Sequence, residues 1–260
     1  MRLKILSRAS ALAQRQAQTV ADAITARFPD VEISRITRAS AGDRDTITQL
    51  SRFADKGAFT SDLSTAVARG DADIVVHSWK DLPVEGHPGT VIAATLERAD
   101  PRDLLLVRRT SCETKPSTFV VLTSSPRRTW MLQTSLAPLL PWPVERIETR
   151  DVRGNITTRV QRLIDGDADA LVVAKAALDR LLQPQDGDAA PDHTLRDMLA
   201  QCRWMVLPLR RFPAAPAQGA LAIEVAARHT ALRDRLTDLC HAPTWDAVSR
   251  ERALLEARGG

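Results

Sequence analysis

Short apolar runs and amphipathic stretches alternate along the first hundred residues. Alternating apolar and polar positions predict a strand over residues 2–6, and helical spacing predicts a helix over residues 10–27. Strands are also predicted over residues 31–37 and 73–77, separated by a helix over residues 59–68 that a glycine ends. This order is typical of an α/β domain with a largely parallel sheet.

A second group of elements begins near Pro101. Its strands are predicted over residues 104–107, 119–122, 144–148 and 170–174, with helices beginning at Ser125 and Asn155 and another over residues 176–182. Residues 205–207 and 221–224 are predicted strands that cross back to the first group, and residues 230–257 are helical with a break near Pro243. Two α/β units joined by two crossings predict a cleft, with ligands beyond the carboxyl ends of the strands.

The 260 residues, 44% of them hydrophobic, suffice for two compact domains. No apolar run is long enough to span a bilayer or to form a signal peptide, so we expect a cytoplasmic protein without a membrane partner. Cys112, Cys202 and Cys240 are isolated, with no CxxC pair and no cluster of metal ligands. We therefore expect free thiols, no disulfide and no bound metal.

Arginine dominates the basic residues of this chain, whose net charge is +4. A guanidinium group binds carboxylates and phosphates through a planar pair of donors, so an anionic partner is one explanation. A gene composition that favours arginine and alanine is the other. Nucleic acid is not the expected partner, because the basic residues are spread along the chain without a basic tail or a helical stripe interleaved with aromatics.

The segment His-Ser-Trp-Lys-Asp-Leu-Pro, residues 77–83, directly follows a predicted buried strand. Lys80 and Asp81 are therefore expected at the rim of the cleft, where the strand ends. A surface loop with solvated charges is the alternative interpretation of this segment.

Two further segments combine a strand end, a helix start and arginine. Residues 123–128 read Thr-Ser-Ser-Pro-Arg-Arg, with Ser as N-cap and Pro at the first helical position. Residues 150–159 place Arg153 before a helix and Arg159 inside it. Helix N-termini attract anions and disfavour arginine, so a bound carboxylate would explain both arginine pairs. The alternative is an N-cap Asn155 followed by a solvated helix face.

Seven segments in the same order resemble the porphobilinogen deaminase (hydroxymethylbilane synthase) family over nearly the full length. They are residues 7–13, 77–83, 97–103, 123–128, 153–159, 178–181 and 216–224. The resemblance implies an α/β fold of two periplasmic-binding-protein-like (type 2) domains around a cleft, with a truncated third domain. The expected boundaries are 1–96 plus 204–224 for the first domain, 97–203 for the second, and 225–260 for a helical remnant of the third.

The resemblance also implies a reaction, in which porphobilinogen, an aminomethyl pyrrole carrying acetate and propionate groups, loses ammonia and is condensed head to tail. The residue matching Asp81 contacts pyrrole N–H groups and stabilises the cation formed when ammonia leaves, with Lys80 beside it. The implied substrate-binding residues are Arg8, Ser10, Phe59, Ser124, Ser125, Arg127, Arg128, Arg153, Arg159 and Arg180. Lys175 stands at a position that is usually uncharged in the family, and is interpreted either as a solvated helix-start residue or as a new charge facing the substrate.

The family carries a dipyrromethane cofactor as a thioether on the cysteine of a Gly-Gly-Cys turn, whereas this sequence reaches Gly259-Gly260 and stops. None of its three cysteines matches the anchor. We therefore expect no dipyrromethane cofactor, and either a naturally short chain or one whose missing third domain is supplied by a separate chain.

Three functions are compatible with these residues. The first is an enzyme that expels ammonia from an aminomethyl pyrrole or a related amine and transfers the electrophile without a covalent cofactor, in a specialised biosynthetic pathway. The second is an ordinary hydroxymethylbilane synthase seen as a fragment or completed by a second chain. The third is a non-catalytic binder of a carboxylated small molecule, against which Asp81 argues, because an anion-binding protein gains nothing from a carboxylate among its arginines.

Overall fold

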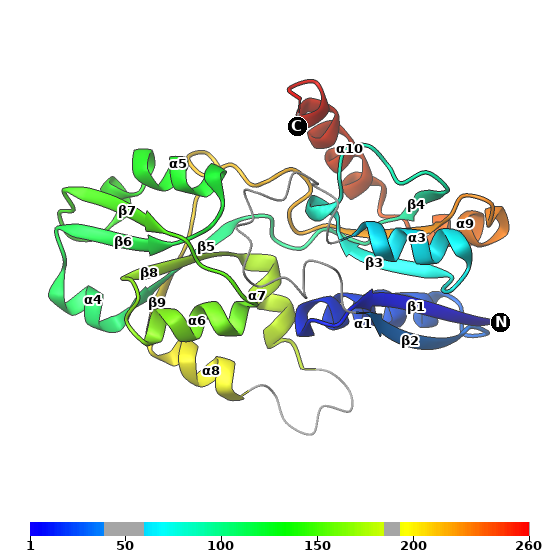
Figure 1. Ribbon diagram of the computed structural model, residues 1–260, viewed down its shortest axis with the longest axis horizontal. Coiled ribbons are helices and arrows are strands. Elements are labelled where there is room, and N and C mark those ends of the chain that lie inside the picture. Colours follow the sequence, from blue (N-terminus) through cyan, green and yellow to red (C-terminus); the bar gives the residue numbers. More distant parts are fainter. Residues whose placement is uncertain (39–59, 185–192, 260) are drawn as a thin grey trace. The chain divides into compact units, whose positions relative to one another are not determined.

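The computed structural model describes residues 1–38, 60–184 and 193–259 (Figure 1). The chain forms two compact units. Unit 1 contains Met1–Ala99 and Pro216–Gly260, and unit 2 contains Asp100–Ala215. None of the described helices has an apolar stretch long enough to cross a membrane.

Unit 1 is built on a five-stranded sheet of order β2-β1-β3-β10-β4. Its strands are β1 (Arg2–Arg8), β2 (Glu32–Arg38), β3 (Ile74–Ser78), β4 (Thr90–Ala94) and β10 (Leu221–Ala226). Strands β2, β1 and β3 are parallel, whereas β10 runs antiparallel to both β3 and β4.

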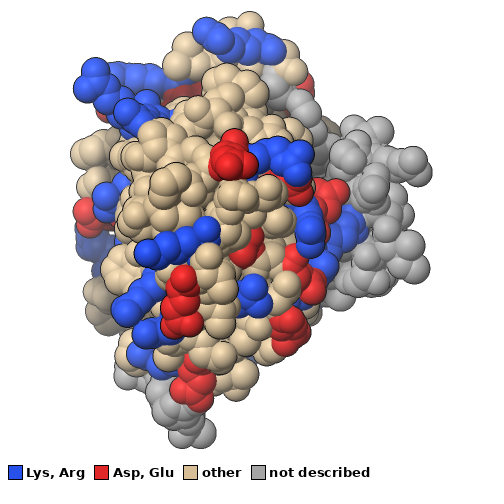
Figure 2. Space-filling model, turned by 90° about the vertical axis from the view of Figure 1, so that its left-hand side faces the viewer, with Lys and Arg blue, Asp and Glu red and all other residues tan. Residues whose placement is uncertain are grey.

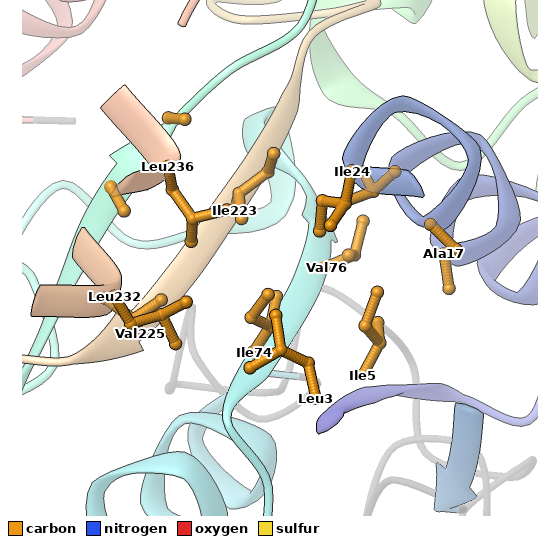
Figure 3. Close-up of a cluster of buried hydrophobic side chains, with 14 of the residues drawn as sticks. Leu3, Ile5, Ala17, Ile24, Ile74, Val76, Ile223, Val225, Leu232 and Leu236 are labelled. Atoms are coloured by element: carbon orange, nitrogen blue, oxygen red, sulfur yellow. The ribbon is translucent and has the colours of Figure 1, made fainter. Parts of the chain in front are cut away.

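The helices of unit 1 pack on this sheet through apolar side chains. They are α1 (Ala11–Arg27), α3 (Ser61–Arg69), η2 (Trp79–Asp81), α9 (Thr230–Leu236), η4 (Thr237–Leu239) and α10 (Ala242–Glu256). Figure 3 shows Ile24 of α1, Val76 of β3 and Ile223 of β10 in one buried cluster, with Leu232 of α9 close to β10. The predicted helix stop is confirmed, because Gly70 ends α3 in the left-handed conformation with φ +94°.

Unit 2 has a second five-stranded sheet, of order β7-β6-β8-β5-β9. Its strands are β5 (Asp103–Arg108), β6 (Thr118–Leu122), β7 (Arg146–Arg150), β8 (Ala170–Ala174) and β9 (Cys202–Val206). Its helices are α4 (Arg109–Thr114), α5 (Pro126–Ser135), η3 (Ala137–Leu139), α6 (Ile156–Ile164), α7 (Lys175–Leu182) and α8 (His193–Ala200). Strands β7, β6 and β8 are parallel, and β5 is antiparallel to β8 and β9.

The two sheets share one topology. In each, three parallel strands are followed across the sheet by an antiparallel strand, β10 in unit 1 and β5 in unit 2, which comes shortly after the chain passes from one unit to the other. The α/β class with two such domains is thereby confirmed. The largely parallel sheet expected in the first unit is found for β2, β1, β3 and β4, which run in one direction, whereas β10 runs against both of its neighbours. In unit 2, β5 likewise runs against β8 and β9. Strands β5 and β10 are nearly continuous buried apolar runs, and such a run does not reveal its direction.

The boundaries differ from the expected ones at two places. Strand β9 pairs with β5 in unit 2, with Val206 opposite Leu104, whereas residues from 204 onward were expected in the first domain. Helices α9 and α10 belong to unit 1, where Leu236 lies in the core and Val248 packs with Trp79. A separate third domain stays a prediction. Strand β4 and helices α4 and α8 were not predicted at all.

Candidate functional site

The basic residues singled out in unit 2 lie where its parallel strands end. Strands β6, β7 and β8 run in one direction, and α5, α6 and α7 begin just beyond their carboxyl ends. The carboxyl ends of parallel strands meet at one edge of a sheet, so these segments are brought together there. We call Arg127, Arg128, Arg153 and Arg159 the arginine edge.

A buried carboxylate holds two of these arginines. Asp103 is 1% exposed, and it stands at this edge because β5 starts opposite Ala174, the last residue of β8. Arg127 Nη2 lies 2.9 Å from Asp103 Oδ2, and Arg128 Nη2 lies 2.7 Å from Asp103 Oδ1. Burial lowers the pKa of Arg127, although Asp103 opposes the shift. Sequence reasoning assigned Asp103 no role, because its partners lie more than twenty residues away.

Positive charge at the arginine edge exceeds what Asp103 neutralises. The buried atoms Arg128 Nε and Arg153 Nη2 have no hydrogen-bond partner among the described residues. Buried polar atoms are nearly always paired, so each such atom needs an explanation. Burial, reinforced by the charge of Arg128, lowers the pKa of Arg159. A bound carboxylate at this edge would supply acceptors and offset the charge.

Arg180 and Lys175 follow the third parallel strand. Burial lowers the pKa of Arg180 to about 10, with Asp179 opposing the shift. Lys175 Nζ lies 2.6 Å from Asp179 Oδ2, one helical turn away, and 4.0 Å from Asp100 Oδ2. An ion pair with a residue one helical turn further on is what a solvated lysine at a helix start is expected to form. Substrate binding by Lys175 stays a prediction.

Serine and asparagine side chains shape the loops of this edge. Ser124 Oγ donates to the carbonyl oxygen of Val152 at 2.7 Å and accepts from its N–H at 2.9 Å, which ties the loop after β6 to the loop after β7. Ser125 and Asn155 are the N-caps of α5 and α6, as predicted. Gly154 has φ +95°, a conformation that favours glycine. Ser124 thus links two loops and Ser125 caps a helix, and contact of either serine with a substrate stays a prediction.

The residues singled out in unit 1 also lie beyond strand ends. Arg8 is the last residue of β1, and Ser10 is the N-cap of α1, accepting from the N–H of Ala13 at 3.4 Å. Lys80 and Asp81 follow β3, the parallel neighbour of β1, in the short helix η2. Phe59 lies outside the described residues.

The two charged residues of η2 differ in their surroundings. Lys80 Nζ donates to Gln218 Oε1 at 3.3 Å. Asp81 is exposed, and its carboxylate has no hydrogen-bond or ion-pair partner among the residues that the structure describes. The Asp81 carboxylate is therefore available to a ligand. We call residues 79–84 the Lys80–Asp81 turn.

A buried cluster lies behind this turn, and sequence reasoning missed it. Glu224 on β10 accepts hydrogen bonds from His77 Nε2 and Ser64 Oγ, both at 2.8 Å, and from Thr90 Oγ1. Burial alone would raise the pKa of Glu224, but the hydrogen bonds from His77, Thr90 and Ser64 outweigh burial and the pKa lies below its usual value. The cluster fixes the end of β3, since His77 is its penultimate residue.

Two of the three cysteines lie at the end of the unit 2 sheet opposite to the arginine edge. Cys202 pairs with Arg108 at the end of β5 opposite to Asp103, and Cys112 lies in α4, which follows Arg108. Cys240 packs against the hydrophobic core of unit 1. Burial raises the pKa of Cys112, and raises that of Cys202 to about 11, which disfavours the reactive thiolate.

Metal or nucleic-acid binding gains no support from the described residues. No group of three or more His, Cys, Asp or Glu side chains among them could hold a metal ion. On the face shown in Figure 2, basic and acidic side chains are interspersed among uncharged ones, without the single-sign surface that nucleic-acid binding needs. Basic side chains gathered where parallel strands end are instead typical of α/β proteins with a site for a small anionic molecule.

Comparison with known proteins gives the family. The sequence model of the protein family described as "Porphobilinogen deaminase, dipyromethane cofactor binding domain" matches residues 3–234 of this chain. The porphobilinogen deaminase of Syntrophomonas wolfei subsp. wolfei is 34% identical over 99% of this chain and 77% of its own length. The porphobilinogen deaminase of Bordetella parapertussis is 36% identical over 100% of this chain and 75% of its own length. The porphobilinogen deaminase of Albidiferax ferrireducens is 39% identical over 99% of this chain and 74% of its own length. The chain belongs to the porphobilinogen deaminase family of biosynthetic enzymes.

Likeness to solved structures is weaker. The periplasmic sulfonate-binding protein SsuA from Methylobacillus flagellatus covers 96% of this chain at 11% identity, with 68% of its own length matched and a TM-score of 0.47. A likeness of this degree adds nothing to the fold, which rests on the order of the strands.

The residues present fit the dipyrromethane cofactor only in part. The guanidinium atoms of Arg128 and Arg153 that have no partner among the described residues suit its carboxylates. Its thioether needs a thiolate, and Cys112, Cys202 and Cys240 do not fit that role, because two are at the far edge of the unit 2 sheet and the third packs on an apolar core.

Proposed function

We propose that this protein binds porphobilinogen, or a closely related aminomethyl pyrrole with carboxylate side chains, and expels ammonia from it. The observation that carries the proposal is the arginine edge, where the buried atoms Arg128 Nε and Arg153 Nη2 lack acceptors among the described residues. Family membership supplies the reaction, and the exposed carboxylate of Asp81 supplies the group that the reaction needs.

The arginine edge is proposed to hold the carboxylates of the pyrrole. A guanidinium group presents paired donors that match a carboxylate, and such charge-assisted hydrogen bonds are about twice as strong as neutral ones. Arg128 and Arg153 are the main candidates, because the buried atoms Arg128 Nε and Arg153 Nη2 have no partner among the described residues. Arg127, whose two Nη atoms donate to Asp103 and to the carbonyl oxygen of Pro213, and Arg159 are proposed beside them. Arg8, Ser10, Phe59, Ser124, Ser125, Lys175 and Arg180 are proposed as further substrate-binding residues.

Asp81 is proposed to stabilise the cation formed in the reaction. The bond between the methylene carbon and the protonated amine breaks, its electron pair leaves with the nitrogen as neutral ammonia, and the pyrrole nitrogen lone pair delocalises to the methylene carbon to give an azafulvenium cation. A carboxylate that accepts a hydrogen bond from the pyrrole N–H stabilises this developing charge. The electrophile then adds water or the unsubstituted carbon of another pyrrole, which loses a proton. Lys80, whose ammonium group donates to Gln218, is proposed to line the same site.

We also propose that no dipyrromethane is attached to any of these 260 residues, and that the pathway served is a specialised one. The positions of the three cysteines support the first point. An ordinary hydroxymethylbilane synthase, with its cofactor held outside these residues or by a separate chain, is the second candidate. Identities of 34–39% to relatives that bear the porphobilinogen deaminase name favour it.

Two measurements test these proposals. Purified protein mixed with porphobilinogen is expected to release ammonia, and no release with any aminomethyl pyrrole would refute the enzymatic function. Tight binding without release would point to the non-catalytic binder. The denatured mass of protein made in cells that synthesise porphobilinogen is expected to equal the bare polypeptide, whereas an excess of two pyrrole units mapped to Cys112, Cys202 or Cys240 would contradict the absence of the cofactor.

A further inference from the structure

Arg252 of helix α10 donates several hydrogen bonds to the backbone of the Lys80–Asp81 turn. Arg252 Nη1 donates to the carbonyl oxygens of Leu82 at 3.2 Å and Trp79 at 3.5 Å. Its Nη2 donates to the carbonyl oxygens of Pro83 and, at 3.4 Å, Val84. One guanidinium group thus serves four backbone carbonyls of one turn, although it lies about 170 residues away in sequence.

The turn needs such a donor because it is too short to satisfy its own backbone. Helix η2 has three residues, and the N–H of Leu82 returns to the carbonyl of Trp79 as its closing hydrogen bond. The carbonyls that follow belong to neither a helix nor a strand, and half-buried carbonyls require partners. A planar guanidinium with five N–H donors can serve several of them at once. Burial lowers the pKa of Arg252, with Glu256 opposing the shift, as expected for an arginine held within the unit.

The neighbouring residue of α10 holds the other segment that Lys80 contacts. Glu251 pairs with Arg98 through two hydrogen bonds of 2.6 and 3.0 Å, and accepts from the N–H of Ala217 at 2.7 Å. Arg98 Nε donates to the carbonyl oxygen of Gln218 at 2.8 Å, and the Gln218 side chain accepts from Lys80. Glu251 and Arg252 therefore fix both ends of the Lys80–Gln218 contact.

Apolar packing joins α10 to the same turn. The rings of Trp79 and Trp245 are 5.3 Å apart between centroids and tilted by 55°. Val248 is fully buried in the same cluster, one turn from Arg252. Aromatic pairs at this distance and tilt favour a defined arrangement. The helix is thus attached to the turn by hydrogen bonds and by side-chain packing.

We propose that α10 is a positioning element for the release of ammonia, with Arg252 as the positioning residue for Asp81. The inference rests on the proposed function, in which Asp81 stabilises the pyrrole cation. Because the Asp81 carboxylate has no partner of its own among the described residues, its place is set by the backbone of the turn, and Arg252 holds that backbone. Displacing a catalytic group by about 1 Å can cost a hundredfold in rate.

The test compares two arginines of the same helix. Arg252→Met keeps the length of the side chain but removes its donors, and kcat for ammonia release is expected to fall at least about tenfold with KM within about threefold. Arg250→Met is the control, because Arg250 is exposed and no hydrogen bond of its side chain occurs among the described residues. In an Asp81→Ala background, Arg252→Met is expected to cause no further loss, because both changes act on one group.

Hydrogen exchange provides a readout that does not depend on activity. In Arg252→Met, faster exchange is expected at residues 79–84 and not in β1 or β10. If Arg252→Met does not fold, Arg252→Lys keeps the charge but not the paired donors and is expected to give an intermediate loss of kcat. The proposal is overturned by a folded variant with unchanged kcat, or by a loss that multiplies with that of Asp81→Ala. If Arg252→Met shows faster exchange at residues 79–84 but the wild type never releases ammonia, Arg252 still holds the turn, and the proposed function is refuted instead.

Discussion

The arginine edge of unit 2 and the Lys80–Asp81 turn of unit 1 both lie beyond the carboxyl ends of parallel strands in sheets of the same topology, yet they are built differently. The arginine edge is half-buried and ion-paired, with Asp103 beneath Arg127 and Arg128. The turn leaves Asp81 exposed and is held from its backbone by α10. A half-buried cationic edge suits binding of an anion, whereas an exposed carboxylate on a fixed turn suits chemistry on a bound ligand.

The largest effect is expected from removing the carboxylate beneath the arginine edge. Asp103→Ala leaves two guanidinium groups without their buried counter-charge, and breaking a buried pair in this way costs about 3–5 kcal/mol of unfolding free energy. Chemical unfolding of the variant measures it, with Asp151→Ala at an exposed position as the control. A loss below about 1 kcal/mol, the usual size for a surface ion pair, would show that Asp103 does not organise this edge.

Acid is expected to act on unit 1 through Glu224. Because its pKa lies below the usual value in the folded protein, the carboxylate stabilises the fold at neutral pH, and that contribution is lost as the pH falls through the lowered pKa. The difference in Tm between the wild type and Glu224→Gln should therefore shrink between about pH 6 and pH 3. Glu85→Gln, at an exposed position, is the control; a difference independent of pH would rule out this linkage.

Binding is expected to depend on the arginine edge. Arg153→Ala removes a guanidinium whose buried Nη2 has no acceptor among the described residues, and should weaken binding of porphobilinogen by about 1.5–3 kcal/mol, the scale of a charge-assisted hydrogen bond. Calorimetry or equilibrium dialysis measures the Kd. An unchanged Kd in both Arg153→Ala and Arg127→Ala would mean that these arginines are structural.

The smallest effect is expected at Lys175. Its ion pair with Asp179 is partly exposed and spans one helical turn, so Lys175→Ala should change the unfolding free energy by only about 0.3–0.5 kcal/mol. Thermal unfolding tests this, and the Kd for porphobilinogen decides between the two interpretations of the residue. A Kd raised more than about tenfold, or about 1.4 kcal/mol, would place Lys175 among the binding residues.

The sequence predicts the elements that carry the site better than the contacts that hold it. Helix α1 spans Ala11–Arg27, where a helix was predicted over residues 10–27, and both arginine-rich segments fall at helix starts as expected. These features are local, since caps, turns and apolar spacing act within a few residues. The motif with Lys80 and Asp81 was found for the same reason.

What the sequence did not reveal are the contacts between distant segments. Asp103 meets Arg128 across 25 residues, His77 meets Glu224 across 147, and Arg252 reaches the turn across about 170. The antiparallel direction of β5 and β10 was missed because a buried apolar run looks the same in either direction. Such contacts depend on the order of strands in the sheet, which periodicity alone does not determine.

The most direct test of the division between binding and chemistry is a joint measurement of kcat and Kd for Asp81→Ala and Asp81→Asn with porphobilinogen. Removing one preorganised electrostatic partner costs about 3–4 kcal/mol at the transition state, so kcat for ammonia release should fall by roughly two to three orders of magnitude. The Kd should stay within about threefold of the wild type, because the arginine edge is unchanged. Activity within about tenfold of the wild type, or a loss that lies in Kd alone, would contradict the assignment of the chemistry to Asp81.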